Sequence, residues 1–73
     1  MKNPKNNPVF MEVIEWLGCP FLFNRKFTDD EIDRIYHTVC ERYPAAETKP
    51  TKFRLSAVAY DVCEDLGFKL SDM

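Results

Sequence analysis

The amino-acid sequence predicts an all-α fold, a small three-helix bundle that takes in the chain from residue 1 to residue 73. Three segments, about residues 8–17, 28–43 and 52–66, repeat apolar residues every three or four positions, which is typical of amphipathic helices. Each segment also has residues at its ends that favour helix starts or stops. With 73 residues and only two glycines, the chain has the composition of one small helical domain with a modest core.

The first predicted helix covers about residues 8–17. Asn7 can cap it, Pro8 suits the first helical position because it lacks an N–H group, and Gly18 can end it. Its apolar residues share one stripe at about 100° per residue, and Met11 and Trp16 lie away from the centre of that stripe. We therefore expect Met11 to be a surface residue and Trp16 to lie beside the buried face.

The second predicted helix, about residues 28–43, has the clearest start signal in the sequence. Thr28 and Glu31 have the spacing of a capping box, in which each side chain bonds the backbone N–H of the other residue. Phe27 and Ile32 occupy the two positions of a hydrophobic staple. Pro44 ends the helix because the residue before a proline disfavours the helical conformation.

The third predicted helix, about residues 52–66, has an ambiguous start and a clear end. Either Thr51 or Ser56 can serve as its N-cap residue. Gly67 can adopt the left-handed conformation that ends many helices, and Phe68 can then fold back onto the last turn.

Two connections have contrasting compositions. Residues 45–50 are mostly polar, and we expect them to form a loop. Residues 21–23 are apolar, but Pro20 and the basic residues that follow discourage a helix. A short extended segment is expected there, and a two-stranded pairing with residues 68–70 is a minor alternative.

Charge and cysteine content exclude several classes of protein. Ten basic and twelve acidic residues give a net charge of −2, which argues against a general binder of nucleic acid or membrane surfaces. No apolar run approaches the roughly 20 residues that cross a bilayer, and the first residues lack the apolar core of a signal peptide. Cys19, Cys40 and Cys63 are odd in number and widely spaced, which favours free thiols and a cytoplasmic location.

Enzymatic and metal-binding hypotheses have little support in the residues. His37 is the single histidine, and Asp33 and Glu41 lie four positions before and after it, a spacing that ordinary exposed helix pairs also explain. Zinc bound by His37 and the three cysteines is an alternative, although the cysteines do not occur as closely spaced pairs. We predict a protein that is not an enzyme, with no catalytic residue, no cofactor and no metal site.

The sequence contains apolar residues that the predicted core does not need, and these favour a function in protein association. Phe53, Ala57 and Tyr60 form a second apolar stripe on the third helix, roughly opposite its core stripe. Met11 and Trp16 add two more apolar side chains away from the predicted core. An exposed apolar patch with aromatic residues commonly marks a binding surface, so these five residues are the predicted partner-binding site.

The sequence is also compatible with two alternative interpretations. Residues 21–23 can cover Phe53 and Tyr60, which would make those aromatic residues part of the core. Lys49, Lys52 and Arg54 form a small basic cluster, which Lys2 and Lys5 could extend and which could make a few phosphate contacts. The alternative function is therefore a nucleic-acid-binding accessory protein.

The leading hypothesis is a small regulator, adaptor or inhibitor that binds another protein, or itself as a homodimer. Small acidic proteins of this kind include those that bacteriophages make against host machinery, and we include that origin as a hypothesis. If Tyr60 lies on the binding surface, Tyr60→Ala should weaken association and leave the helix content intact.

Overall fold

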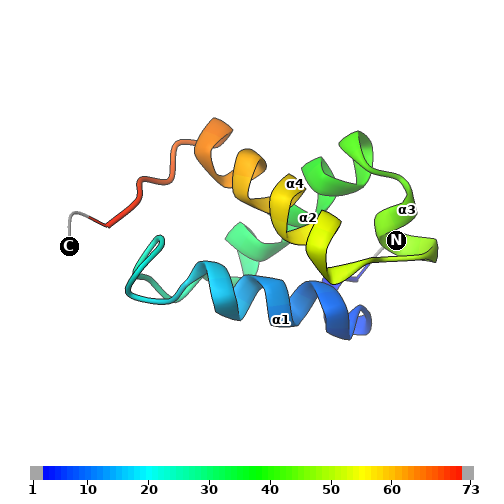
Figure 1. Cartoon of the computed structure of the whole chain (residues 1–73), viewed down its shortest axis with the longest axis horizontal. Helices are drawn as coiled ribbons and strands as arrows, with labels where there is room; N and C mark the ends of the chain where they lie inside the picture. Colours follow the sequence, from blue (N-terminus) through cyan, green and yellow to red (C-terminus); the bar gives the residue numbers. More distant parts are fainter. Residues whose placement is uncertain (1–2, 72–73) are drawn as a thin grey trace.

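The computed structural model describes residues 3–71 and confirms the all-α prediction (Figure 1). The three predicted helices are present, and two short helical segments accompany them. In chain order the elements are the 3-10 helix η1 (Pro4–Asn6), α1 (Pro8–Leu17), α2 (Asp29–Arg42), α3 (Ala45–Thr48) and α4 (Lys52–Asp65).

Helix α1 starts as its sequence predicts, and it ends at Gly18 without the left-handed conformation that a glycine cap often adopts. The Asn7 side chain accepts a hydrogen bond from the Phe10 N–H at 3.1 Å, and Pro8 is the first helical residue. Gly18 caps the C-terminus in the right-handed conformation, with φ −80°. The glycine is required there by space, because a Cβ atom at this position would overlap the backbone carbonyl oxygen of Arg25.

Helix α2 begins with the predicted capping box. The Glu31 N–H donates to the Thr28 hydroxyl at 3.2 Å, and the Thr28 N–H donates to the Glu31 carboxylate at 2.8 Å. Phe27 and Ile32 are both buried, as a hydrophobic staple requires. The Arg25 side chain forms an ion pair with the Glu31 carboxylate, so the residues before the helix are held against its first turn.

We expect the capping box to make the stability of the protein sensitive to acid. The hydrogen bond from the Thr28 N–H, together with the nearby charge of Arg25, lowers the pKa of Glu31 below its ordinary value of 4.5, although desolvation opposes this. A carboxyl group with a lower pKa in the folded state stabilises the fold above its unfolded pKa, and this contribution is lost as the pH falls through the folded pKa. Urea unfolding between pH 7 and pH 3 should show a steeper loss of stability for the wild type than for Glu31→Gln. Parallel pH profiles would contradict this assignment.

The expected loop at residues 45–50 contains the helix α3, so that expectation is wrong. Pro44 has a helical φ of −57°, and Ala46 within α3 is fully buried. The Ala46 N–H donates to the carbonyl of Tyr43 at 2.9 Å. Four residues are too few to show an apolar period, and burial of Ala46 is what stabilises this turn.

Helix α4 resolves the ambiguity at the third helix. Thr51 occupies the N-cap position, although its side chain makes no capping hydrogen bond. The alternative start at Ser56 is wrong, because the Ser56 hydroxyl lies inside the helix and donates to the Lys52 carbonyl at 2.7 Å. The C-terminal prediction is confirmed. Gly67 has φ +97°, and the Phe68 N–H donates back to the Cys63 carbonyl at 3.0 Å.

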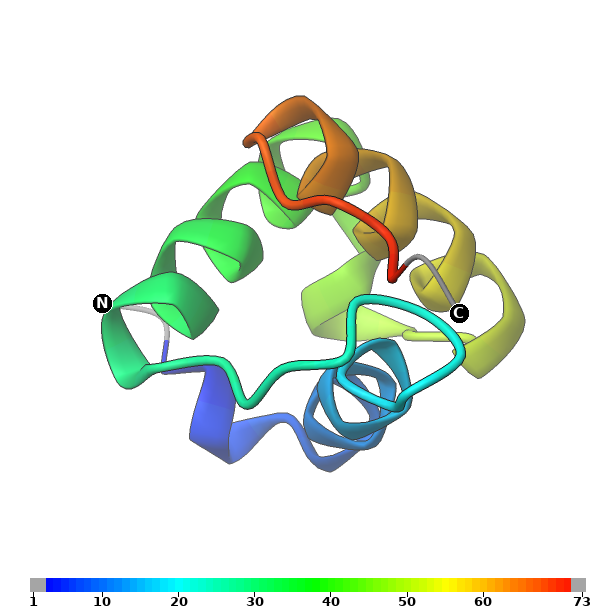
Figure 2. The ribbon, with the colours of Figure 1, turned by 90° about the vertical axis from the view of Figure 1, so that its left-hand side faces the viewer.

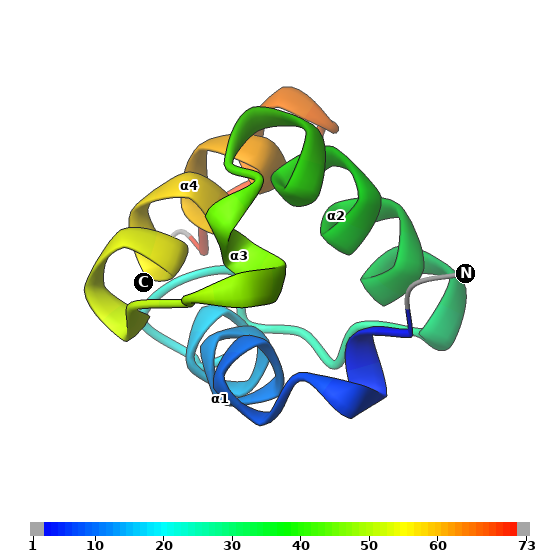
Figure 3. The ribbon, with the colours of Figure 1, turned by 90° about the vertical axis from the view of Figure 1, so that its right-hand side faces the viewer.

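The three long helices enclose one core, with α4 packed against both α1 and α2. Helix α3 lies across one end of the bundle (Figure 3). The chain from α1 to α2 passes around the opposite end (Figure 2). The largest fully buried side chains are Phe10, Leu17, Ile35, Leu55, Val13, Val39, Val62 and Cys63.

Residues 21–23 form turns, so the expected extended segment is wrong. Residues 3–71 contain no β-strand, which also excludes the pairing with residues 68–70. The N–H groups of Leu22 and Asn24 both donate to the Cys19 carbonyl, and this closes the chain into a tight loop. The C-terminal segment still approaches this loop, because the Ser71 N–H donates to the Leu22 carbonyl at 2.6 Å.

Candidate functional site

An apolar groove runs along the exposed face of α4 beside the C-terminal half of α1. Its volume is about 720 Å³. It is lined by Trp16, Lys52, Phe53, Ser56, Ala57, Tyr60 and Asp61. Four of the five residues predicted to bind a partner therefore lie together, and Met11 is the exception.

The groove exists because α4 has two apolar faces and the core covers only one of them. Leu55 and Ala59 are fully buried against the rest of the bundle. Phe53 lies on the other face and is 85% exposed, and Trp16 of α1 is 46% exposed at the side of the groove. Such large exposed aromatic side chains cost free energy in water, which is relieved when a partner covers them.

Tyr60 belongs partly to the core. It is half-buried, and its ring lies 5.6 Å from the ring of Phe23, which is itself buried. The segment 21–23 therefore covers Tyr60 but leaves Phe53 open. Tyr60→Ala would remove core contacts as well as groove surface. A substitution of Phe53 therefore tests the groove more specifically.

Met11 lies on a different surface of α1. It is half-buried in a smaller groove of about 330 Å³, where Ile14, Phe27 and Ile32 also lie. The structure therefore does not bring Met11 together with Trp16 and the aromatic residues of α4.

Charged side chains line the rim of the main groove. The Lys52 ammonium lies 3.3 Å from the Glu12 carboxylate, which links the start of α4 to α1 across the rim. Arg54 and Asp61 are exposed on α4, and within residues 3–71 neither forms an ion pair. The groove lining therefore has one cation, Lys52, and one anion, Asp61.

The residues of the predicted basic cluster are exposed, but Lys5 does not lie close to all of them. Lys52 and Arg54 are exposed in the first turn of α4, and Lys49 is exposed at the end of α3. Lys52 is paired with Glu12, which offsets part of the positive charge. The Lys5 ammonium lies 3.7 Å from the Asp29 carboxylate at the N-terminal end of α2. Lys49 follows α3, which comes after the C-terminal end of α2. Lys2 lies outside the described residues.

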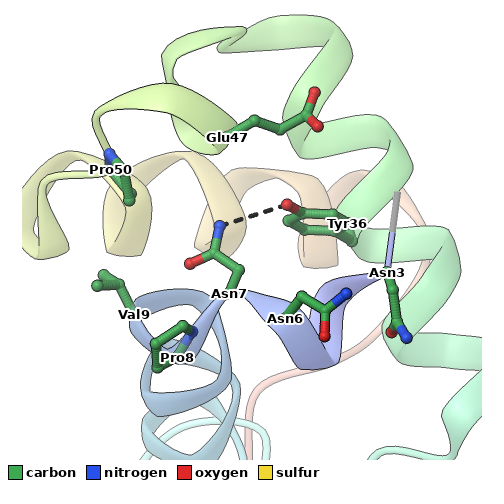
Figure 4. A pocket seen from close by; sticks show the side chains of 8 residues that line it. All are labelled: Asn3, Asn6, Asn7, Pro8, Val9, Tyr36, Glu47 and Pro50. Atoms are coloured by element: carbon green, nitrogen blue, oxygen red, sulfur yellow. Dashed lines mark hydrogen bonds between the residues drawn. The ribbon is translucent and has the colours of Figure 1, made fainter. Parts of the chain in front are cut away.

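A second cavity of about 610 Å³ adjoins the N-terminus of α1 (Figure 4). Asn7, which is only 8% exposed, donates to the Ala46 carbonyl at 2.8 Å and to the Tyr36 hydroxyl at 3.3 Å. Burial raises the pKa of Tyr36 above its ordinary value, and the hydrogen bond from Asn7 opposes that rise. The sequence predicts only the capping role of Asn7. Its bonds to α2 and α3 link residues that are far apart in the chain, so no local signal could have indicated them.

The four residues of the zinc alternative differ in their exposure. His37 is exposed on α2, whereas Cys40 and Cys63 are buried, and burial raises the pKa of the Cys63 thiol to about 12. Among residues 3–71, no group of three or more His, Cys, Asp or Glu side chains is placed to hold a metal ion. In the same part of the chain, no helix is both long enough and apolar enough to cross a membrane.

The fold and the groove together define a small helical bundle with an exposed aromatic surface. Comparisons with protein-family models, with curated proteins and with solved structures found no match. The function is therefore inferred from the groove and its residues.

Proposed function

We propose that this protein acts by binding another polypeptide chain through the groove between α1 and α4, without catalysing a reaction. The observation that carries the proposal is the exposure of Phe53 next to Trp16 and Ala57 in one apolar groove. Aromatic side chains that provide contact area at low entropic cost are the usual anchors of protein interfaces. A regulator, adaptor or inhibitor in the cytoplasm is the class of protein that this surface fits, and a bacteriophage origin remains a hypothesis within that class.

Two further observations favour binding over the alternatives. The groove lining contains neither histidine nor cysteine, and the exposed His37 lies on α2. The basic cluster gives weaker support to nucleic-acid binding, because Lys52 is paired with Glu12 and acidic Asp61 lies farther along the same helix. Phosphate contacts require unopposed positive charge.

Photo-crosslinking at position 53 tests the proposal. A photoreactive benzoylphenylalanine in place of Phe53 should form covalent adducts with a second polypeptide when the protein is irradiated, pure or in a lysate of its source. The adducts would be detected as species heavier than the 8.6 kDa chain and identified by mass spectrometry. The substitution should leave the free energy of unfolding within about 0.5 kcal/mol of the wild type, because the Phe53 side chain is exposed.

Phe21 supplies a matched control. It is 82% exposed, close to the 85% of Phe53, but it does not line the groove. Adducts formed at position 53 and absent at position 21 support binding in the groove. Equal labelling at both positions would mean that exposure alone explains the adducts, and the proposal would then be wrong.

A further inference from the structure

We infer that the polypeptide bound in this groove is a second copy of the same chain, packed with its α4 antiparallel to the first. The inference rests on the proposed function and adds the identity of the partner. It is carried by the order of charges and side-chain sizes along the exposed face of α4. A second α4 that runs in the opposite direction presents complementary charges and sizes to this face.

The charges form the first part of the argument. Arg54 and Asp61 are seven residues apart, so they lie two turns apart on one flank of α4, within about 20° of the same direction. When two helices are related by a twofold axis and run antiparallel, the same flank of each helix meets that of the other. With the axis beside Ala57, Arg54 of each copy lies next to Asp61 of the other copy. Two ion pairs form from side chains that have no ion-pair partner within residues 3–71 of the single chain.

The charges also select the direction of packing. In a parallel pair the twofold axis would place the flank of Arg54 and Asp61 on opposite sides of the interface in the two copies. Neither Arg54–Asp61 ion pair could then form, and both charges would lose the complementary partner that favours association. The antiparallel arrangement is therefore the one that these two residues support.

Side-chain size agrees with the same axis. Ala57 is small and exposed at the middle of α4, so two helices can approach closely there. Phe53 and Tyr60 lie on either side of it, about one turn away in each direction. In an antiparallel pair about this axis the exposed Phe53 ring of one copy lies at about the height of Tyr60 of the other, where the two rings can pack together, and the twofold axis repeats this contact.

Charge reversal tests the arrangement. The wild type should reach twice the mass of the 8.6 kDa chain with rising concentration in sedimentation or light-scattering measurements. Arg54→Glu and Asp61→Arg should each raise the dissociation constant by roughly thirtyfold, because each turns two attractive pairs into repulsive ones. An equimolar mixture of the two variants should dimerise as the wild type does, and so should the double variant R54E/D61R.

The controls separate pairing from folding. Glu near the N-terminus of α4 and Arg near its C-terminus both suit the helix dipole, so neither reversal should unfold the helix. Arg34→Glu and Asp33→Arg, at exposed positions of α2, should leave the dissociation constant unchanged. A dimer that the single reversals do not weaken, or that the double reversal does not restore, would overturn the antiparallel arrangement.

The outcomes also distinguish this inference from the proposed function. If the wild type stays at the mass of one chain up to millimolar concentration, the inference is wrong. Adducts of a different protein at position 53 would then still support the proposed function. If no adducts form either, both proposals fail.

Discussion

Replacing Asn7 with alanine is expected to lower the free energy of unfolding by about 3 kcal/mol, because one side chain serves two purposes. As an N-cap, its oxygen accepts from the Phe10 N–H at 3.1 Å, and losing a cap costs about 1 kcal/mol. Its nitrogen donates to the buried carbonyl of Ala46 at 2.8 Å and to the Tyr36 hydroxyl at 3.3 Å. Leaving these buried groups without a partner costs about 1–3 kcal/mol more.

The size of this effect matters because the protein is small. Native stability amounts to roughly 0.05–0.15 kcal/mol per residue, so a chain of 73 residues cannot lose 3 kcal/mol without a marked fall in its melting temperature. Urea unfolding followed by circular dichroism measures the change. Helix α3 should lose its order first, because the bond from Asn7 to Ala46 is what joins it to the start of α1.

Two control variants separate the two roles of Asn7. Asn7→Ser keeps an N-cap acceptor but cannot replace both donated bonds, so it should cost about 2 kcal/mol. Tyr36→Phe removes only the longer of those bonds and should cost about 1 kcal/mol. If both Asn7 variants remain within about 1 kcal/mol of the wild type, the hydrogen bonds to α2 and α3 do not hold the fold together.

The second large effect is expected at Gly18, where alanine should cost about 2 kcal/mol. Gly18 has φ −80°, which alanine adopts freely, so conformation alone predicts that Gly18→Ala would stabilise the protein. Packing predicts the opposite sign, because the new Cβ would overlap the Arg25 carbonyl oxygen. The Arg25 N–H also donates to the Gly18 carbonyl at 3.1 Å, so relieving the overlap would disturb this hydrogen bond.

Gly67 is the matched comparison for Gly18. A Cβ there would meet nothing within 4 Å, but φ is +97°, so alanine should cost about 1 kcal/mol through conformation. Asparagine tolerates the left-handed region, so Gly67→Asn should recover part of that loss, whereas Gly18→Asn should not be better than Gly18→Ala. Chemical unfolding of the four variants checks both statements. A Gly18→Ala variant more stable than the wild type would show that the loop does not approach α1 as described.

Interactions between residues close in the chain were predictable from the sequence. The capping box of Thr28 and Glu31, the stop at Gly67 and the outward stripe of Phe53 and Ala57 all follow from side chains within about two turns of each other. Their geometry is fixed once the helix forms. For that reason most helix ends and the outward stripe could be predicted from the sequence, whereas the start of the third helix and the exposure of Phe53 and Tyr60 stayed open.

Features that depend on what packs against a residue became known only once the folded arrangement was known. The sequence does not distinguish Phe21 from Phe23, yet one is 82% exposed and the other is buried against Phe27 and Tyr60. It also places Met11 with the aromatic residues of the third helix, although Met11 lies on another surface.

The sequence predicted three amphipathic helices, most of their ends and a second apolar stripe on the third helix, and it left open whether that stripe is covered. The folded arrangement showed that Ala46 anchors the short helix α3, that Gly18 is needed for space, and that Asn7 joins three elements. The physical reason is the distance along the chain between the residues that interact. Caps and stripes depend on neighbours in the chain, whereas burial and overlap depend on atoms that only folding brings together.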